Sequence, residues 1–209
     1  DAIWYGAVAT ILYTFIGGFL AVSWTDTIQA TLMLFALILT PVFVLMNIGG
    51  FEVMEAAITH AETIAQRHYN DMFTGTTLLG VASLMAWGLG YFGQPHIVVR
   101  FMAAEGVKSL ENARRISMTW MIICLAGAIG IGYFGMAYFF VHPEQASVVS
   151  HNNEQIFIEL AKLLFNPWIA GILLSAILAA VMSTLSAQLL ICSSAITEDL
   201  YKGILRPEA

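Results

Sequence analysis

Two adjacent hydroxyl residues, Ser183 and Thr184, are the first candidates for chemistry in this sequence. Thr184 continues a small-residue series at four-residue spacing, after Ala176 and Ala180. Neutral oxygen atoms suit a hard cation, which nitrogen and sulfur ligands do not. In the alternative, each hydroxyl donates to a carbonyl one turn earlier in its own helix, as serine and threonine commonly do in membrane helices. The spacing alone favours this second interpretation.

A second candidate is the run from Trp87 to His96, WGLGYFGQPH, which places three glycines and a proline within ten residues. Such a run breaks a helix, and unwound backbone is tolerated at membrane depth only where protein or a wet cavity satisfies its polar groups. Trp87 and Tyr91 are four residues apart and could form an aromatic wall for a small solute, with Gln94 and freed carbonyls as polar contacts. The alternative is a proline kink flanked by interfacial aromatic residues.

Asp26 is a single carboxylate between two long uncharged stretches. Its ordinary interpretation is an N-cap, or a first-turn carboxylate that faces the positive end of a helix dipole. Enzyme chemistry is not indicated, because no nucleophile, base and orienting group can be named together. The histidines, at positions 60, 68, 96, 142 and 151, also show no metal-ligand spacing.

The elements that position these residues follow from the distribution of charge. Only 11% of the residues are Asp, Glu, Lys or Arg, against about 25% in soluble domains. Five long stretches carry no charge, and about 20 apolar residues suffice to cross the roughly 30 Å hydrocarbon core as a helix. We therefore predict an all-α integral membrane protein with five transmembrane helices, at residues 3–23, 27–50, 76–99, 116–141 and 166–197.

The same composition argues against other classes of protein. The uncharged runs do not alternate in polarity as the strands of a membrane β-barrel do. A net charge of −6 argues against a nucleic-acid partner. Because the chain opens with Asp1 directly before a full-length span, we expect it to be part of a longer protein.

Orientation follows from the basic residues, which accumulate in cytoplasmic loops. Most of them lie in the predicted inner loop, residues 100–115, or after the last span, and only Arg67 and Lys162 lie on the other side. We therefore place Asp1 outside and the carboxyl end in the cytoplasm. The outer loops, 51–75 and 142–165, are predicted to contain short amphipathic helices, with apolar faces formed by Val53, Ala57, Ala61 and Ile64 and by Phe157, Leu160 and Leu164.

Two patterns concern packing and helix initiation. Ala128, Gly132 and Gly135 recur at helical spacing, which predicts a small-residue face that lets another helix approach closely. Asn166 followed by Pro167 is typical of an N-cap and a first helical residue.

Five segments together resemble the sodium:solute symporter family. The similarity runs along nearly the whole chain, and only residues 52–71 look divergent. The matching segments are residues 12–19 (LYTFIGGF), 24–26 (WTD), 87–96, 113–117 (ARRIS) and 179–186 (AAVMSTLS).

The resemblance implies the inverted-repeat fold shared with the leucine transporter, in which two five-helix repeats hold solute and sodium at the midplane. This chain would supply the last two helices of the first repeat and the first three of the second. It would lie in the bacterial cytoplasmic (inner) membrane as a multi-pass protein. Its partners would be lipid and the remaining helices of the full-length transporter.

The resemblance also implies roles for particular residues. Trp87, Tyr91 and Pro95, with Gln94 beside them, correspond to a proline pocket, and Ser183 and Thr184 correspond to sodium ligands. Asp26 corresponds to a carboxylate implicated in sodium-dependent function. The other sodium ligands would come from a broken helix outside this chain.

The expected function is therefore sodium-coupled secondary active uptake of proline, with sodium as the co-transported ion and no enzyme activity. Two alternatives stay open. One is a symporter for another small solute such as pantothenate, and the other is the membrane sensory domain of a signalling protein.

The orientation can be tested with single cysteines placed at Lys108 and at Asn152 in the full-length protein. We expect an impermeant thiol reagent to label the two positions from opposite sides of the membrane, because they lie on predicted inner and outer connections. Labelling of both positions from outside intact cells would contradict the assignment.

Overall fold

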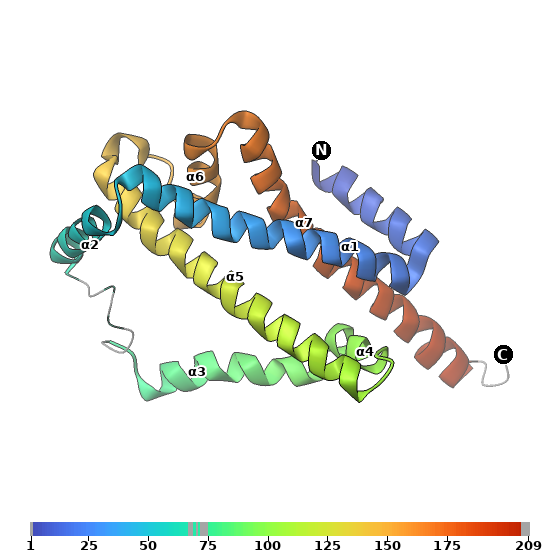
Figure 1. Ribbon diagram of the computed structural model, residues 1–209. Helices are drawn as coiled ribbons and strands as arrows, with labels where there is room; N and C mark the ends of the chain where they lie inside the picture. The colour runs from blue at the N-terminus through green and yellow to red at the C-terminus, as the bar shows by residue number, and fades with distance from the viewer. Residues whose placement is uncertain (1, 67–68, 70, 72–74, 206–209) are drawn as a thin grey trace. The chain divides into compact units, whose positions relative to one another are not determined.

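The computed structural model describes residues 2–66, 69, 71 and 75–205, and all regular secondary structure in this part of the chain is helical (Figure 1). The predictions that concern Asp1, Arg67, the basic residue Arg206 after the last span and part of the outer loop 51–75 fall outside the described residues. The elements are α1 (Ala2–Ile48), α2 (Phe51–Ala65), α3 (Leu78–Leu89), η1 (Gly90–Gly93), α4 (Pro95–Met102), α5 (Val107–Val141), η2 (Pro143–Gln145), η3 (Asn153–Gln155), α6 (Ile156–Leu164), α7 (Pro167–Ser194) and η4 (Ala195–Leu205).

Three of the described helices are long and apolar enough to cross a membrane: Ile3–Ile48, Val107–Val141 and Pro167–Ile204. This agrees with the prediction of an all-helical membrane protein. The shorter α3 is also apolar. The division into five spans stays a prediction.

The chain forms two compact units. The first combines residues 1–33, 90–111 and 175–209, and the second combines residues 34–89 and 112–174. All but one of the candidate site residues belong to the first unit. Trp87 belongs to the second.

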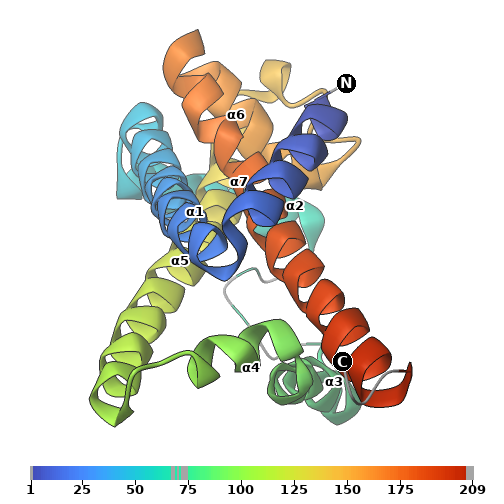
Figure 2. The same cartoon turned by 90° about the vertical axis from the view of Figure 1, so that its right-hand side faces the viewer.

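The helix α1 breaks at Gly18, where φ is 53° and ψ is −144°. This backbone region is accessible almost only to glycine. Residues 2–17 form a first arm that turns back at this point from the second arm, as Figures 1 and 2 show. The predicted boundary at residues 24–26 therefore does not coincide with the chain turn. The charge of Asp26 guided that prediction, but Asp26 lies within the second arm.

The other predicted span boundaries also differ from the observed helix ends, because they too were placed by charge. The predicted inner loop, residues 100–115, contains the end of α4 and the start of α5, which begins at Val107. The last helix continues beyond residue 197 through η4, a π-helix that ends at Leu205. Uncharged stretches identify residues suited to the hydrocarbon core, whereas a helix can extend into water beyond it.

The predicted N-cap of α7 is confirmed, since Asn166 Oδ1 accepts a hydrogen bond from the Ile169 amide at 3.0 Å.

The second unit has a hydrophobic core at the end of α1. Its members come from α1, α2, α5, α6 and the segment before η3: Val44, Ile48, Met54, Ala57, Ile58, Ile131, Ala137, Tyr138, Phe139, Val149 and Leu160. Within this core, the hydroxyl of Tyr138 donates a hydrogen bond to Gln145 Oε1 at 3.0 Å.

Both predicted outer helices are present, as α2 and α6. Leu160 is fully buried as expected, but α2 buries Met54, Ala57 and Ile58 while Val53 and Ile64 are exposed.

Close packing between α5 and the second half of α1 depends on Gly127. A Cβ atom at this position would lie 2.5 Å from the carbonyl oxygen of Leu37, so the two backbones are nearly in contact. One turn on, a Cβ at Gly130 would lie 3.3 Å from Pro41 Cβ. The predicted small-residue face is confirmed at Gly135, and at Gly132 it stays a prediction. Gly135 does pack, against Ile156 and Leu160, but no atom lies within 4 Å of a Cβ built at Gly132.

Replacement of Gly127 by alanine should destabilise the full-length protein by about 1–3 kcal/mol, because the new methyl group forces the helices apart. The measurement is thermal melting in detergent. Gly132→Ala is the matched control on the same helix. It should be neutral or stabilising, since alanine is the better helix former. Equal losses in the two variants would contradict the proposed crossing.

Candidate functional site

The helix break predicted within residues 87–96 is present. The helix α3 ends at Leu89, η1 forms a tighter 3-10 turn from Gly90 to Gly93, and α4 starts at Pro95. Gln94 joins them in extended backbone, with φ −88° and ψ 110°. The proline explains the new start, because its fixed φ suits the first helical position and its missing N–H is not needed there.

The candidate solute-binding residues lie before, within and after this break along the chain. Trp87 stands on the last turn of α3 with 73% of its surface exposed, and Tyr91 in η1 is 42% exposed. Gln94 is half-buried and makes no side-chain cap to α4. Its carbonyl accepts the amides of Ile97 and Val98 at 3.0 and 3.1 Å. The first turn of α4 is thus capped by the backbone carbonyl of Gln94, and the side-chain amide of Gln94 takes no part in the cap.

The two hydroxyls on α7 meet at one carbonyl. Ser183 Oγ and Thr184 Oγ1 both donate to the Ala180 carbonyl, at 3.0 and 3.1 Å. This is the backbone-bonded arrangement that the spacing favoured. A donating hydroxyl keeps its lone pairs, so the same oxygens retain acceptor capacity for a hard cation. Ser183 lies one turn after the buried Ala179, on the same face of α7. Thr184 lies on the neighbouring face of the helix and is exposed.

Asp26 has a different role from the predicted N-cap. It lies inside the second arm of α1 and is 9% exposed, and its Oδ2 atom accepts a hydrogen bond from Arg100 Nη2 on α4. The N-cap interpretation was wrong because α1 starts its second arm at the Gly18 break. The Oδ1 atom is buried, with no hydrogen-bond partner in the described part of the chain.

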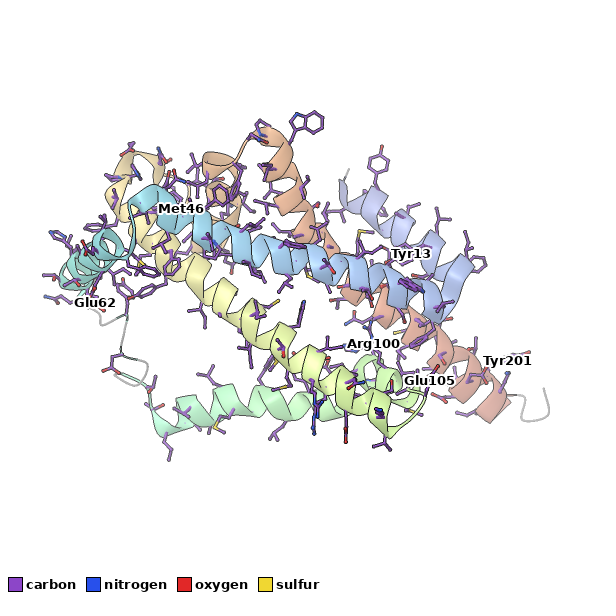
Figure 3. The ribbon with its side chains drawn as sticks, viewed as in Figure 1. Tyr13, Met46, Glu62, Arg100, Glu105 and Tyr201 are labelled. Atoms are coloured by element: carbon purple, nitrogen blue, oxygen red, sulfur yellow. The ribbon has the colours of Figure 1, made fainter. Side chains whose placement is uncertain are left out.

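The helices α1, α4 and α7 converge beside this ion pair. A crevice of about 10 Å³ lies between them, barely enough for one water molecule. Side chains from all three helices line it: Phe19, Val22, Ser23, His96, Val99, Arg100, Ala187, Leu190 and Ile191. Figure 3 marks the position of Arg100 on α4.

Sequence reasoning missed Arg100 as a partner and counted it only as a basic residue of the inner loop. A signal was available. Asp26 and Arg100 are isolated opposite charges at the edges of uncharged stretches, and both had been assigned to the inner side. Two such charges at one membrane boundary are expected to pair.

Comparison with known proteins fits this helical, membrane-type architecture. The chain matches the profile of the sodium:solute symporter family over residues 1–209. The chain belongs to the sodium:solute symporter family.

Its relatives include named proline transporters. A sodium/proline symporter of Haemophilus influenzae is 70% identical and one of Escherichia coli is 65% identical, each aligned over 100% of this chain and 41% of the relative. A high-affinity proline transporter of Bacillus subtilis is 48% identical over 99% of this chain and 42% of the relative. The chain thus spans about two fifths of the length of these relatives. No solved structure matched it.

Proposed function

We propose that this chain is part of a sodium-coupled symporter that takes up proline across the bacterial cytoplasmic membrane. The observation that carries the proposal is the 65–70% identity, along the entire chain, to relatives named sodium/proline symporter. Another solute or a sensory role has no comparable support. In this function the protein moves its substrates without making or breaking covalent bonds, so the site needs binding groups and no catalytic residue.

The solute site lies at the helix break in this proposal. Proline is compact and zwitterionic, so its pocket needs an apolar wall for the ring and exposed dipoles for the charges. Trp87 and Tyr91 supply the wall. Gln94, Pro95 and the start of α4 supply an amide and the positive end of a short helix, which favours a carboxylate.

The sodium site includes Ser183 and Thr184, and the rest of its ligands come from helices outside this chain. The resemblance of residues 179–186 to the family supports this assignment, and the bonds that both hydroxyls donate to the Ala180 carbonyl leave their lone pairs free for a cation. Asp26 is proposed to act in ion coupling. The five-plus-five inverted-repeat bundle, the five spans and the cytoplasmic carboxyl end belong to the same proposal.

Replacement of Trp87 by alanine tests the solute site. In the full-length transporter it should raise the proline concentration for half-maximal uptake by about tenfold or more, equivalent to at least 1.4 kcal/mol of binding energy, with a much smaller change in the sodium requirement. Uptake of labelled proline at varied proline and sodium concentrations measures both. Phe15→Ala, at another highly exposed aromatic residue, is the control. A comparable loss there would mean that the Trp87 effect is structural.

Replacement of Thr184 by valine tests the sodium site, since it keeps the shape of the side chain and deletes its oxygen. Loss of one neutral ligand should shift the sodium dependence of proline uptake to about tenfold higher concentration, for each 1.4 kcal/mol of binding lost. Ser193→Ala, farther along α7, should leave it unchanged. If neither Thr184→Val nor Ser183→Ala alters the sodium dependence, the hydroxyls serve only their bonds to Ala180.

A further inference from the structure

The ion pair between Asp26 and Arg100 differs from the others between described residues. It joins α1 to α4 across 74 positions of sequence. The other ion pairs join near neighbours on the chain: His142 with Glu144, Glu159 with Lys162, and Glu198 with Lys202. Asp26–Arg100 therefore constrains the tertiary arrangement of the first unit, which the local pairs cannot do.

The partial burial of the Asp26–Arg100 ion pair is compatible with a contact that forms and breaks. The side chain of Asp26 is 11% exposed and that of Arg100 is 46% exposed. A fully exposed pair contributes little, whereas separation of a fully buried pair leaves bare charge in an apolar medium. Here the Arg100 side chain is about half exposed among the described residues, so the carboxylate is the more buried partner of the pair. Among the described residues, Arg100 is also the one hydrogen-bond partner of this carboxylate.

The element that Arg100 contacts is short and is bounded by a glycine-containing turn and by irregular backbone. The helix α4 has eight residues, with the glycine-containing turn η1 before it and the irregular residues 103–106 after it. Cβ atoms built at Gly90, Gly93 and Gly106 would meet no atom within 4 Å apart from their chain neighbours, so these three positions have open space beside them. A contact on α4 therefore controls the half of the broken helix that begins at Pro95.

We propose that Arg100 is a positioning residue whose ion pair with Asp26 latches α4 against the second arm of α1. The closed latch seals the cytoplasmic side of the solute site, and its opening exposes that side. The inference rests on the proposed function and on the predicted orientation. Consistent with a closed state, the crevice between α1, α4 and α7 has only about 10 Å³ of free space.

The test is thiol labelling of Ser23→Cys, a crevice position, in full-length transporter that is otherwise free of cysteine. Inside-out membrane vesicles expose the cytoplasmic side to an impermeant maleimide. Arg100→Gln should speed labelling about tenfold, which corresponds to a shift of about 1.4 kcal/mol towards the open state. Asp26→Asn should do the same, and the double variant should add nothing further, because both remove one interaction.

Exchange of the two charges, Asp26→Arg together with Arg100→Asp, should return labelling towards the parent rate. A merely structural role would not be restored in this way. Arg100→Lys provides a variant with the charge retained and the two-pronged geometry lost, and it should label at an intermediate rate. Lys202→Gln removes an exposed neighbour pair with Glu198 and should leave labelling unchanged.

Unchanged labelling in Arg100→Gln, or rapid labelling in the charge exchange, would overturn the latch. The readout requires no proline, so it separates the two proposals. A parent protein that fails to take up proline would contradict the proposed function alone. A parent that transports normally while Arg100→Gln labels at the parent rate would contradict the latch alone.

Discussion

The absence of water from the hydrocarbon core is the constraint on which the rest of this structure depends. A polar group there must find its partner within the protein. Several hydroxyls on the long helices comply locally. Thr10 donates to the Gly6 carbonyl and Thr40 to the Ala36 carbonyl, each at 2.8 Å. Against this background, a helix break and a carboxylate bonded across helices are exceptions that need an explanation beyond packing.

Both exceptions involve the short stretch that ends with α4, because Asp26 is bonded to Arg100 on that helix. The break between Leu89 and Pro95 gives up helical hydrogen bonds, and the guanidinium of Arg100 holds the segment after it. A continuous helix would be more stable and could not rearrange. In the proposed latch, the interrupted helix gives up part of this stability so that its second half, α4, can move, as proteins commonly do at functional sites.

The helix break, the start of α7 and the membrane class could be predicted from the sequence, because local residues determine them. Pro95 and the neighbouring glycines predicted the break, and Asn166 with Pro167 predicted the start of α7. The uncharged stretches predicted the membrane class. Chain turns were harder, since Gly18 resembles Gly17 in sequence and only the folded backbone shows which one takes the positive φ.

Pairing between distant residues was harder still. The approach of Gly127 to the Leu37 backbone and the contact between Asp26 and Arg100 depend on which helices meet, and periodicity within one helix carries no such information. The same limit applies at Gly132, where the packing face stays a prediction. The roles proposed for Ser183 and Thr184 came from resemblance, because their spacing alone favours the bonds to Ala180 that the structure contains.

The turn at Gly18 also bears on how the protein is made. A single glycine separates the two arms of α1, with no loop between them. If each arm crosses the bilayer, as the prediction of five spans has it, we expect the two arms to insert together as a helical hairpin. Asp26, near the tip of that hairpin, would then enter the bilayer beside a neighbouring helix rather than facing lipid alone. A bulkier residue at position 18 would act first on biogenesis, lowering the amount of inserted protein before any effect on its activity could be measured.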